Sequence, residues 1–232
     1  MRVVFVHGAC VRDGEWWWHR TARELQRRGV TSTAPGLPSC GEGAAAPGAH
    51  GPGLTDDVAA VAAVLQDSAK PTVLVVHSYG GIVAAQAAVG AGAVRHALLV
   101  SSYLARPGES LSSFGEPEPA PFLDIDPDGG TFGVRNDALA ATFLQDCPPD
   151  VVATAGSRLA RQSLSVTQEP VSASAWQNVP TTYLVCTDDR GTPEAAQHEF
   201  ARRADRVVDI AAGHHPFLSQ PAAVADLVVT LT

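Results

Sequence analysis

Several features that would assign this chain to a common class are missing from its 232 residues. Lysine and arginine number 16 against 24 aspartates and glutamates, so the formal charge is −8 at pH 7. Because binding to phosphates needs a cationic surface, we expect no nucleic-acid partner. No apolar stretch reaches the ~20 residues that a membrane-spanning helix requires, so we expect no membrane partner either.

Cysteine is also scarce. Cys10, Cys40, Cys147 and Cys186 are far apart and form no CxxC pair. The spacing argues against a disulfide framework or a metal site and favours reduced thiols in the cytoplasm. The apolar run at the N-terminus, Val3 to Val6, is too short for a signal peptide and predicts a buried strand instead.

Short β-branched runs alternate with longer alanine-rich stretches. This alternation is typical of an α/β fold, in which a mostly parallel sheet is covered by helices on both faces. The glycine- and proline-rich segment 35–53 predicts a loop. We expect six strands, at Val3–Val6, Gly29–Ala34, Thr72–Val76, Ala97–Ser101, Thr182–Cys186 and Arg206–Ile210.

The strand rhythm stops after the fourth expected strand, between residues 106 and 178. Helices are expected there at 138–145 and 149–161. An insertion at this point of an open α/β sheet lies where ligands bind, which predicts a small helical lid. The sequence therefore predicts a single domain, 1–232, with 106–178 as the inserted lid region.

The strongest chemical signal is Ser78, which lies between an expected strand and an expected helix. A serine on such a sharp turn is forced to expose its hydroxyl above the sheet, and Gly80 supplies the small neighbour that this turn needs. The usual G-x-S-x-G pattern has glycine where this chain has Val76, so the motif is only half matched. The alternative is an ordinary helix-capping serine.

Three weaker signals follow other strands. Gly8 permits a sharp turn after the first strand, where the N–H of Ala9, together with that of Tyr79, can stabilise an oxyanion. Asp188 and Asp189 follow the fifth strand, and either can orient a histidine. His214 and His215 follow the sixth, in a glycine-flanked loop suited to a general base and lacking the spacing of metal ligands. Taken singly, each is also explained by a turn or a surface loop.

The order of these residues strengthens the prediction. Serine comes first, then the acid, then histidine, each after a strand and at the same sheet edge, which is the α/β-hydrolase order and differs from both protease orders. The sequence therefore predicts a triad of Ser78, an aspartate and a histidine.

With these residues in view, the chain resembles the compact α/β-hydrolases of the plant methylesterase and hydroxynitrile-lyase group and their bacterial relatives. The similarity lies in the opening at 5–10, the tryptophan run 16–18, the lid segment 143–147, the acid segment 183–189 and the histidine segment 213–221. The resemblance implies the α/β-hydrolase fold, with Asp189 as the acid and His214 as the base.

Two departures from the group bear on the chemistry. Hydroxynitrile lyases of this type have a lysine beside the catalytic histidine and a hydroxyl residue in the position of Ala9. This chain has His215 and Ala9 there, and neither can play those parts. Ester hydrolysis therefore fits better than cyanide chemistry.

We accordingly expect a serine hydrolase that cleaves a small carboxylic ester through an acyl-enzyme, without cofactor or metal. Aromatic residues and His215 are expected to line the substrate pocket, although such aromatic residues more often belong to the core than to a pocket. Two alternatives remain open, a lyase, C–C hydrolase or cyclase on the same fold, and a non-catalytic small-molecule binding protein. The sequence predicts no oligomeric state. The expected pocket residues are Trp17, Phe143, His215 and Phe217.

Overall fold

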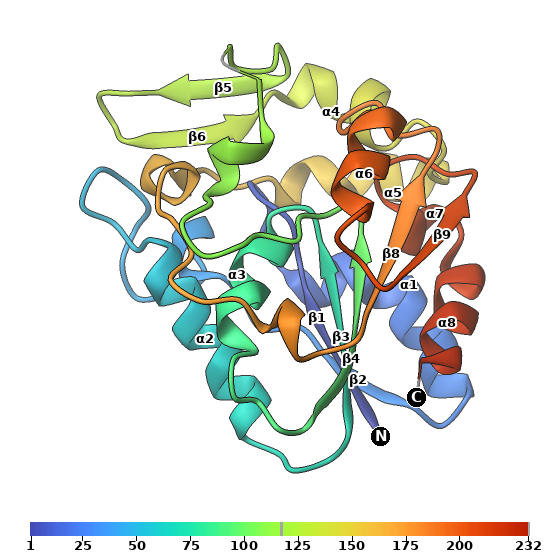
Figure 1. Cartoon of the computed structure of the whole chain (residues 1–232). Helices are drawn as coiled ribbons and strands as arrows, with labels where there is room; N and C mark the ends of the chain where they lie inside the picture. Colours follow the sequence, from blue (N-terminus) through green and yellow to red (C-terminus); the bar gives the residue numbers. More distant parts are fainter. Residues whose placement is uncertain (117, 232) are drawn as a thin grey trace.

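A parallel sheet of six strands forms the centre of the molecule in the computed structural model, which describes residues 1–116 and 118–231 (Figure 1). The predicted α/β architecture is therefore confirmed, and every expected strand is present. Across the sheet the strands are β2 (Thr31–Thr33), β1 (Arg2–Val6), β3 (Thr72–His77), β4 (Val94–Val100), β8 (Thr181–Cys186) and β9 (Arg206–Ile210).

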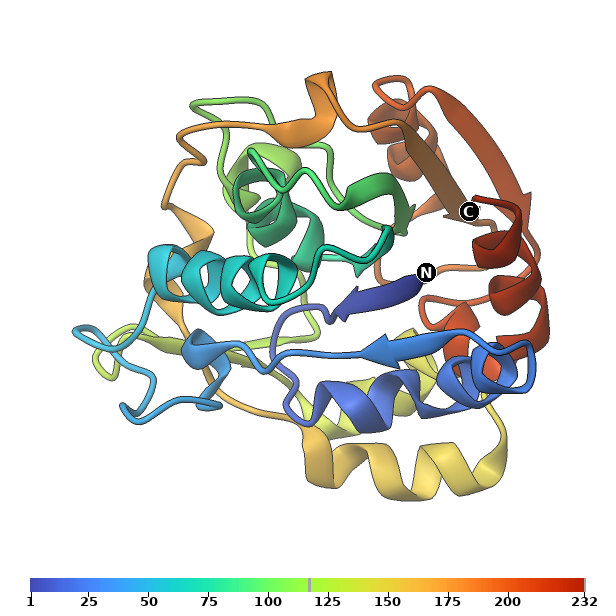
Figure 2. The ribbon, with the colours of Figure 1, turned by 90° about the horizontal axis from the view of Figure 1, so that it is seen from below.

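Helices cover both faces of the sheet, as Figure 2 shows end-on. Successive side chains of a strand point to opposite faces. In β3, Leu74 and Val76 accordingly join the core beneath α2 and α3, whereas Val73 and Val75 join the core beneath α1 and α8. None of the helices in the described residues is long and apolar enough to cross a membrane. The helices around the sheet are α1 (Gly14–Arg27), α2 (Leu54–Gln66), α3 (Gly80–Ala87), α6 (Glu194–Ala201), α7 (Pro216–Ser219) and α8 (Pro221–Thr230).

The tryptophan run 16–18 lies near the start of α1. Asp13 caps the helix by accepting the N–H of Trp16 at 3.3 Å. Trp17 and Trp18 are each 1% exposed, and Trp18 stacks between Phe5 of β1 and Phe217 of α7. These aromatic contacts hold α1 against β1 and α7.

The segment between β4 and β8 contains a small sheet that the sequence analysis missed. It forms a cap above the central sheet, with two helices as expected at α4 (Asn136–Phe143) and α5 (Pro149–Ala155), the second shorter than predicted. The additional strands are β5 (Leu123–Asp126), β6 (Thr131–Val134) and β7 (Gln162–Ser163), all antiparallel. The lid is therefore mixed rather than purely helical.

The hairpin between β5 and β6 has a recognisable physical cause. Its turn is Pro127-Asp128-Gly129-Gly130, in which Gly130 adopts a positive φ of 63°. Side chains alternate between apolar and polar along β5, which is the pattern of a half-buried strand. Proline, aspartate and glycine are the residues that favour such a turn.

Candidate active site

Ser78 occupies a strained turn between β3 and α3. Its φ is +48°, a conformation that side chains rarely adopt, and it lifts the half-buried serine into a cavity at the carboxyl edge of the sheet. The carbonyl of Ser78 accepts hydrogen bonds from the N–H of Gly81 at 3.0 Å and the hydroxyl of Ser102 at 2.6 Å. The turn is thus held from both sides.

The turn forms although Val76 stands where the usual motif has glycine. Val76 is fully buried in β3 and paired with Val6 and Leu99, so its side chain points into the core and away from the serine. The position that has no room for a side chain lies two residues after the serine. A Cβ on Gly80 would lie 2.7 Å from the carbonyl oxygen of Val6 and 2.8 Å from that of His7.

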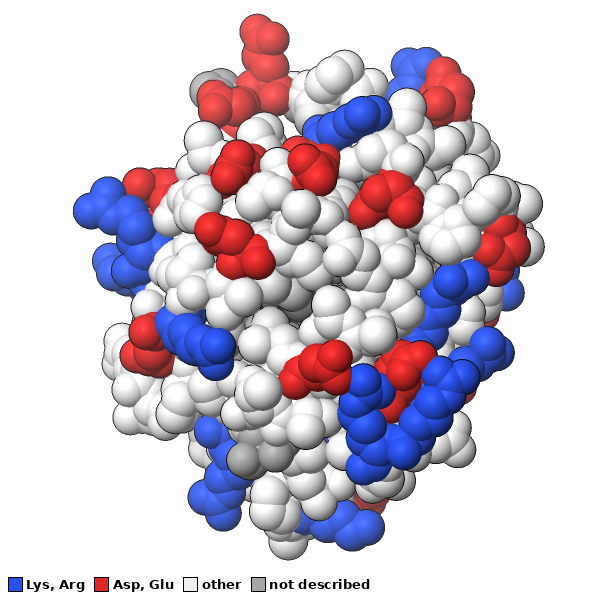
Figure 3. Space-filling view, turned by 90° about the vertical axis from the view of Figure 1, so that its right-hand side faces the viewer, with Lys and Arg blue, Asp and Glu red and all other residues white. Residues whose placement is uncertain are grey.

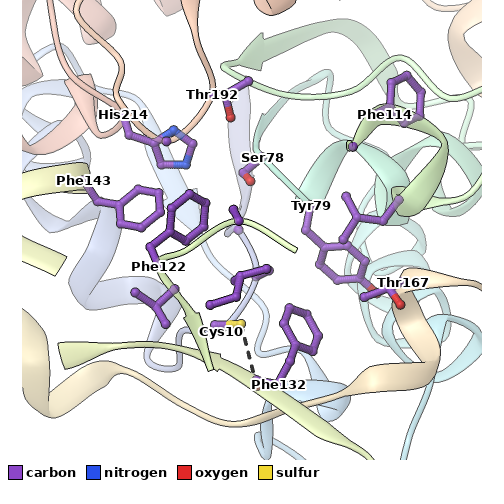
Figure 4. Close-up of a pocket in the computed structure, with 18 of the residues that line it drawn as sticks. Cys10, Ser78, Tyr79, Phe114, Phe122, Phe132, Phe143, Thr167, Thr192 and His214 are labelled. Carbon is purple, nitrogen blue, oxygen red and sulfur yellow. Dashed lines mark hydrogen bonds between the residues drawn. The ribbon is translucent and has the colours of Figure 1, made fainter. Parts of the chain in front are cut away.

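His214 lies in the loop between β9 and α7, opposite an aspartate. Its Nδ1 is 2.7 Å from Oδ2 of Asp189, and both residues are less than a tenth exposed. Asp188, the other candidate acid, is exposed and bonds through its backbone. The carboxylate that faces the histidine is therefore that of Asp189. Figure 4 shows the ring of His214 and the hydroxyl of Ser78 at the same cavity.

Two further side chains bind Asp189, and neither was among the residues predicted from the sequence. The hydroxyl of Ser101 donates to Oδ2 at 2.7 Å, from a backbone with a positive φ of 41°. The amide of Gln197 on α6 donates to the same oxygen at 3.1 Å. Ser101 directly follows β4. A polar residue at the carboxyl end of a parallel strand is a sign of a site residue, and this sign could have identified Ser101 from the sequence.

The backbone completes the environment of Asp189. Its Oδ1 accepts the N–H groups of Gly191 and Thr192 at 2.8 and 2.9 Å. Burial raises the pKa of Asp189, but the facing His214 and these hydrogen bonds outweigh burial, and the net shift is downward. The carboxylate is therefore held ionised against the ring of His214.

Two neutral histidines flank His214. The ring centroids of His77 and His215 lie 4.4 and 5.0 Å from that of His214. Burial, reinforced by the neighbouring His214, lowers the pKa of His77 well below its usual value and that of His215 to about 3. The Nδ1–H of His215 donates to the carbonyl of Phe143 at 3.0 Å. Of the three rings, only His214 contacts a carboxylate.

Ala9 and Tyr79 line the same cavity, shortly after the ends of β1 and β3, and each carries a backbone N–H group. Within the described part of the chain, neither group donates a hydrogen bond to the protein. Both donors are thus free for an oxygen atom of a bound molecule. Backbone N–H groups without a protein partner are the donors that stabilise an oxyanion when both point at it.

The turn that presents Ala9 is fixed by the preceding histidine. Nδ1 of His7 lies 2.8 Å from the carbonyl oxygen of Gly8, and Nε2 lies 2.9 Å from Oε2 of Glu42. Glu42 also accepts the N–H of Asp13 at 2.7 Å. The loop after β2 is thereby fastened to the turn after β1, so this part of the glycine-rich segment is structurally tied to the site.

The cavity has a volume of about 940 Å³ and a mainly apolar lining. Phe122 and Phe143 from the cap cover the side near His214, and Phe114 and Phe132 lie beyond Ser78 and Cys10 (Figure 4). The dashed line in that view joins the thiol of Cys10 to the carbonyl of Phe132, 3.9 Å apart. All four residues expected to line a pocket do so, namely Trp17, Phe143, His215 and Phe217.

No group of three histidine, cysteine or acidic side chains in the described residues is arranged to hold a metal ion. Among the described residues of the cavity lining, Cys10 carries the one thiol, and burial raises its pKa far above the usual range. It therefore stays protonated, which is unsuitable for a nucleophile. Ser78 is the nucleophile candidate that the geometry leaves.

Comparison with known proteins identifies the fold family. Residues 3–227 match the family described as "Alpha/beta hydrolase family". The alpha/beta hydrolase nvfD of Aspergillus novofumigatus (strain IBT 16806) is 31% identical over 196 residues, covering 78% of this chain and 77% of the relative.

Solved structures share the fold along nearly the whole chain. A pyrethroid hydrolase from Sphingobium faniae JZ-2 superposes with a TM-score of 0.85 at 21% identity, over 99% of this chain and 96% of the other. Polyneuridine aldehyde esterase superposes with a TM-score of 0.80 at 22% identity, over 99% and 98%. At these identities the likeness concerns the fold.

Proposed function

The chain belongs to the α/β-hydrolase family, and on that premise we propose that it hydrolyses a carboxylic ester through a covalent acyl-enzyme. The observation that carries the proposal is the joint geometry of three groups. Ser78 stands in a positive-φ turn, His214 lies at the same cavity, and Asp189 contacts Nδ1 of that histidine.

Each group has a defined step. Ser78 Oγ attacks the ester carbonyl carbon while Nε2 of His214 takes its proton, because Nδ1 is bound to Asp189. The carbonyl oxygen becomes an oxyanion held by the N–H groups of Ala9 and Tyr79. As the C–O bond breaks, His214 returns the proton to the leaving alcohol. The histidine then removes a proton from water, which hydrolyses the acyl-enzyme and regenerates Ser78.

The residue beside the base supports hydrolysis over cyanide chemistry. His215 stands where hydroxynitrile lyases of the resembled group have lysine, and its pKa is lowered to about 3. It is therefore neutral and gives no cation to stabilise cyanide. Ala9 likewise has no hydroxyl to offer a cyanohydrin.

The cavity supports an uncharged substrate with a large apolar part. Its volume of about 940 Å³ is at the upper end of small-molecule sites, ~300–1,000 Å³. Among the described residues that line it there is no lysine or arginine, whereas Glu116 and Glu118 from the cap do line it. A carboxylate-bearing ester would find no cationic partner there.

The test is intact-protein mass after exposure to a fluorophosphonate, with turnover of a short-chain nitrophenyl ester measured in parallel. We expect one adduct on the wild type, no adduct on Ser78→Ala, and loss of at least about 10³-fold in kcat in that variant. Ser68→Ala, in the loop before β3 at the opposite sheet edge, is the matched control and should keep both properties.

Two results would contradict the proposal. A wild type that takes no label and hydrolyses no ester would exclude an activated serine and favour a binding role. Turnover of a carbonyl substrate that survives in Ser78→Ala would instead indicate proton-transfer chemistry by His214, as a lyase or cyclase would use.

A further inference from the structure

A buried chain of hydrogen bonds runs beneath the cavity, outside the triad. Oε1 of Gln162 accepts the backbone N–H of Cys10 at 3.0 Å, and its amide nitrogen donates to the hydroxyl of Ser39 at 2.9 Å. Ser39 donates in turn to Oδ2 of Asp57, which also accepts the phenol of Tyr79 at 2.8 Å. All five residues are at most 1% exposed.

The two ends of this chain coincide with the two halves of the proposed oxyanion hole. Tyr79 supplies one of the free N–H groups through its backbone, while its side chain is held by Asp57. Cys10 directly follows Ala9, which supplies the other, and Cys10 itself has a positive φ of 60°. A change in the position of either end residue would move a donor relative to the reacting carbonyl.

The members come from parts of the chain that no local structure would hold together. Ser39 lies in the turn Pro38–Cys40 after β2, Asp57 in α2 and Gln162 in β7 of the cap. Gln162 is supported on the same side, since the N–H of Ala160 donates to the carbonyl of Cys10 at 2.9 Å. The cap is therefore attached to the turn that presents Ala9.

Asp57 makes this arrangement costly. Its burial raises the pKa of the carboxyl, although bonds from Ser39 and Tyr79 work against that shift. A buried carboxylate without a cation bonded to it destabilises a fold compared with apolar residues of the same volume. Stability alone gives no reason for such a group, whereas a fully satisfied polar network fixes geometry that apolar contacts leave adjustable.

We propose that Gln162 and Asp57 are positioning residues that set the separation of the Ala9 and Tyr79 N–H groups through the chain Cys10–Gln162–Ser39–Asp57–Tyr79. This inference rests on the proposed acyl-enzyme function, because the oxyanion hole has a role only there. Neither residue is among the described residues that line the cavity. The cap, through Gln162, thus takes part in forming the oxyanion hole as well as in covering the cavity.

The experiment removes each end of the chain while leaving the backbone donors in place. Gln162→Met removes the acceptor for Cys10, and Tyr79→Phe removes one hydroxyl. Deleting an oxyanion donor outright costs about 10²–10³ in kcat. For a displaced donor we expect kcat to fall about tenfold or more in each variant, with KM within about twofold of the wild type. Affinity for a phenylboronic acid, whose serine adduct carries a tetrahedral oxyanion, should fall in parallel with kcat.

The double variant tests whether the residues act as one chain. Residues that share a network give non-additive effects. We therefore expect Gln162→Met/Tyr79→Phe to lose at most about threefold more kcat than the worse single variant. All rates are expressed per active site, counted by exhaustive fluorophosphonate labelling, so that loss of folded protein is not mistaken for loss of kcat.

Ser163→Ala is the matched control. Ser163 is the neighbour of Gln162 in β7, is equally buried, and accepts the N–H of Gly48 at 3.2 Å without touching Cys10. It should lower the melting temperature while leaving kcat and boronic acid affinity unchanged.

The outcomes separate clearly. Wild-type kcat in both single variants, or an equal loss in Ser163→Ala, would overturn the positioning role, and multiplying losses in the double variant would overturn the coupling. If Gln162→Met does not fold, Tyr79→Phe alone decides through kcat and boronic acid affinity. A wild type that takes no fluorophosphonate label would instead count against the proposed function.

Discussion

Three histidine rings pack edge to face at one end of the cavity, and only one of them is bonded to a carboxylate. A positive charge forming on His214 is therefore matched by Asp189, and no second cation competes for that aspartate. Burial of His77 and His215 keeps both rings neutral. Because burial lowers their pKa values, these two histidines also make the free energy of unfolding depend on pH.

His215 should make the fold sensitive to acid. Its pKa is lowered from 6.5 to about 3, so between these values the unfolded chain binds a proton that the folded chain does not. The free energy of unfolding therefore falls as the pH falls from 6.5 towards 3. His215→Asn keeps a donor for the carbonyl of Phe143 and removes this titration. We expect its melting temperature to be lower than the wild type's at pH 7, with a difference that shrinks or reverses at pH 4.

The control is His50→Asn, a histidine exposed in the loop after β2. It should follow the wild-type melting temperature at every pH. A His215→Asn curve parallel to that of the wild type between pH 7 and pH 4 would show that His215 contributes nothing to acid sensitivity.

At the scale of the elements, the start of helix α3 packs directly against the end of β1. The Gly80 position accommodates no side chain, because a Cβ would press on the carbonyls of Val6 and His7. Both are backbone atoms at the end of a central strand and cannot rotate away. The start of α3 and the turn after β1, which carries Ala9, therefore depend on each other's position.

Gly80→Ala should consequently be strongly destabilising. Overpacking of this kind costs typically 1–3 kcal/mol, about the loss we expect in urea unfolding. Gly92→Ala, whose Cβ would meet nothing within 4 Å, is the control and should be neutral within about 0.5 kcal/mol. If the two variants are equally stable, α3 and β1 can move apart enough to accept the added methyl group without loss of stability, and the prediction is wrong.

Most of the central strands were predictable because they are short runs of β-branched or apolar residues buried on both faces, as β3 shows from Thr72 to His77. The edge strands β2 and β9 are partly exposed. The cap hairpin was not predicted, because β5 carries two aspartates and is half exposed. Its stability comes from pairing with β6 and from packing over the cavity, and neither is visible in a local pattern.

The same contrast applies to the site. Ser78, an aspartate and a histidine could be predicted because each follows a strand in the α/β-hydrolase order, and the resemblance to the methylesterase group then pointed to Asp189 and His214. Ser101, Gln197 and the residues of the buried chain could not, since their roles depend on contacts between distant segments. Gln162 and Cys10, for example, are 152 residues apart in sequence.

At the scale of the whole molecule, all strands of the central sheet are parallel, so their carboxyl ends meet at one edge. The turns that carry Ala9, Ser78, Ser101, Asp189 and His214 lie at that edge, and the cap covers it. Acidic side chains outnumber basic ones by eight, and on the face shown in Figure 3 the two kinds are interspersed. The long-range field is therefore that of an anion.

This charge should discriminate among substrates. For two nitrophenyl esters of equal acyl length, one ending in a methyl group and one in a carboxylate, we expect KM to be at least about threefold higher for the anionic ester at low salt. The ratio should narrow as salt screens the repulsion. Glu118→Gln, at the cavity, should narrow it further, whereas Glu24→Gln on α1, paired with Arg28, should not. Preference for the anionic ester would contradict the proposed substrate class.

The buried position of Val76 has a consequence for how such enzymes are found in genomes. A search pattern that demands glycine two residues before the serine would pass over this chain, although its serine stands in the required conformation. The positions without room for a side chain come after the serine, where Gly80 and Gly81 each lie against backbone carbonyls. A pattern that fixes those two glycines and leaves the earlier position free would recover proteins that the stricter one discards.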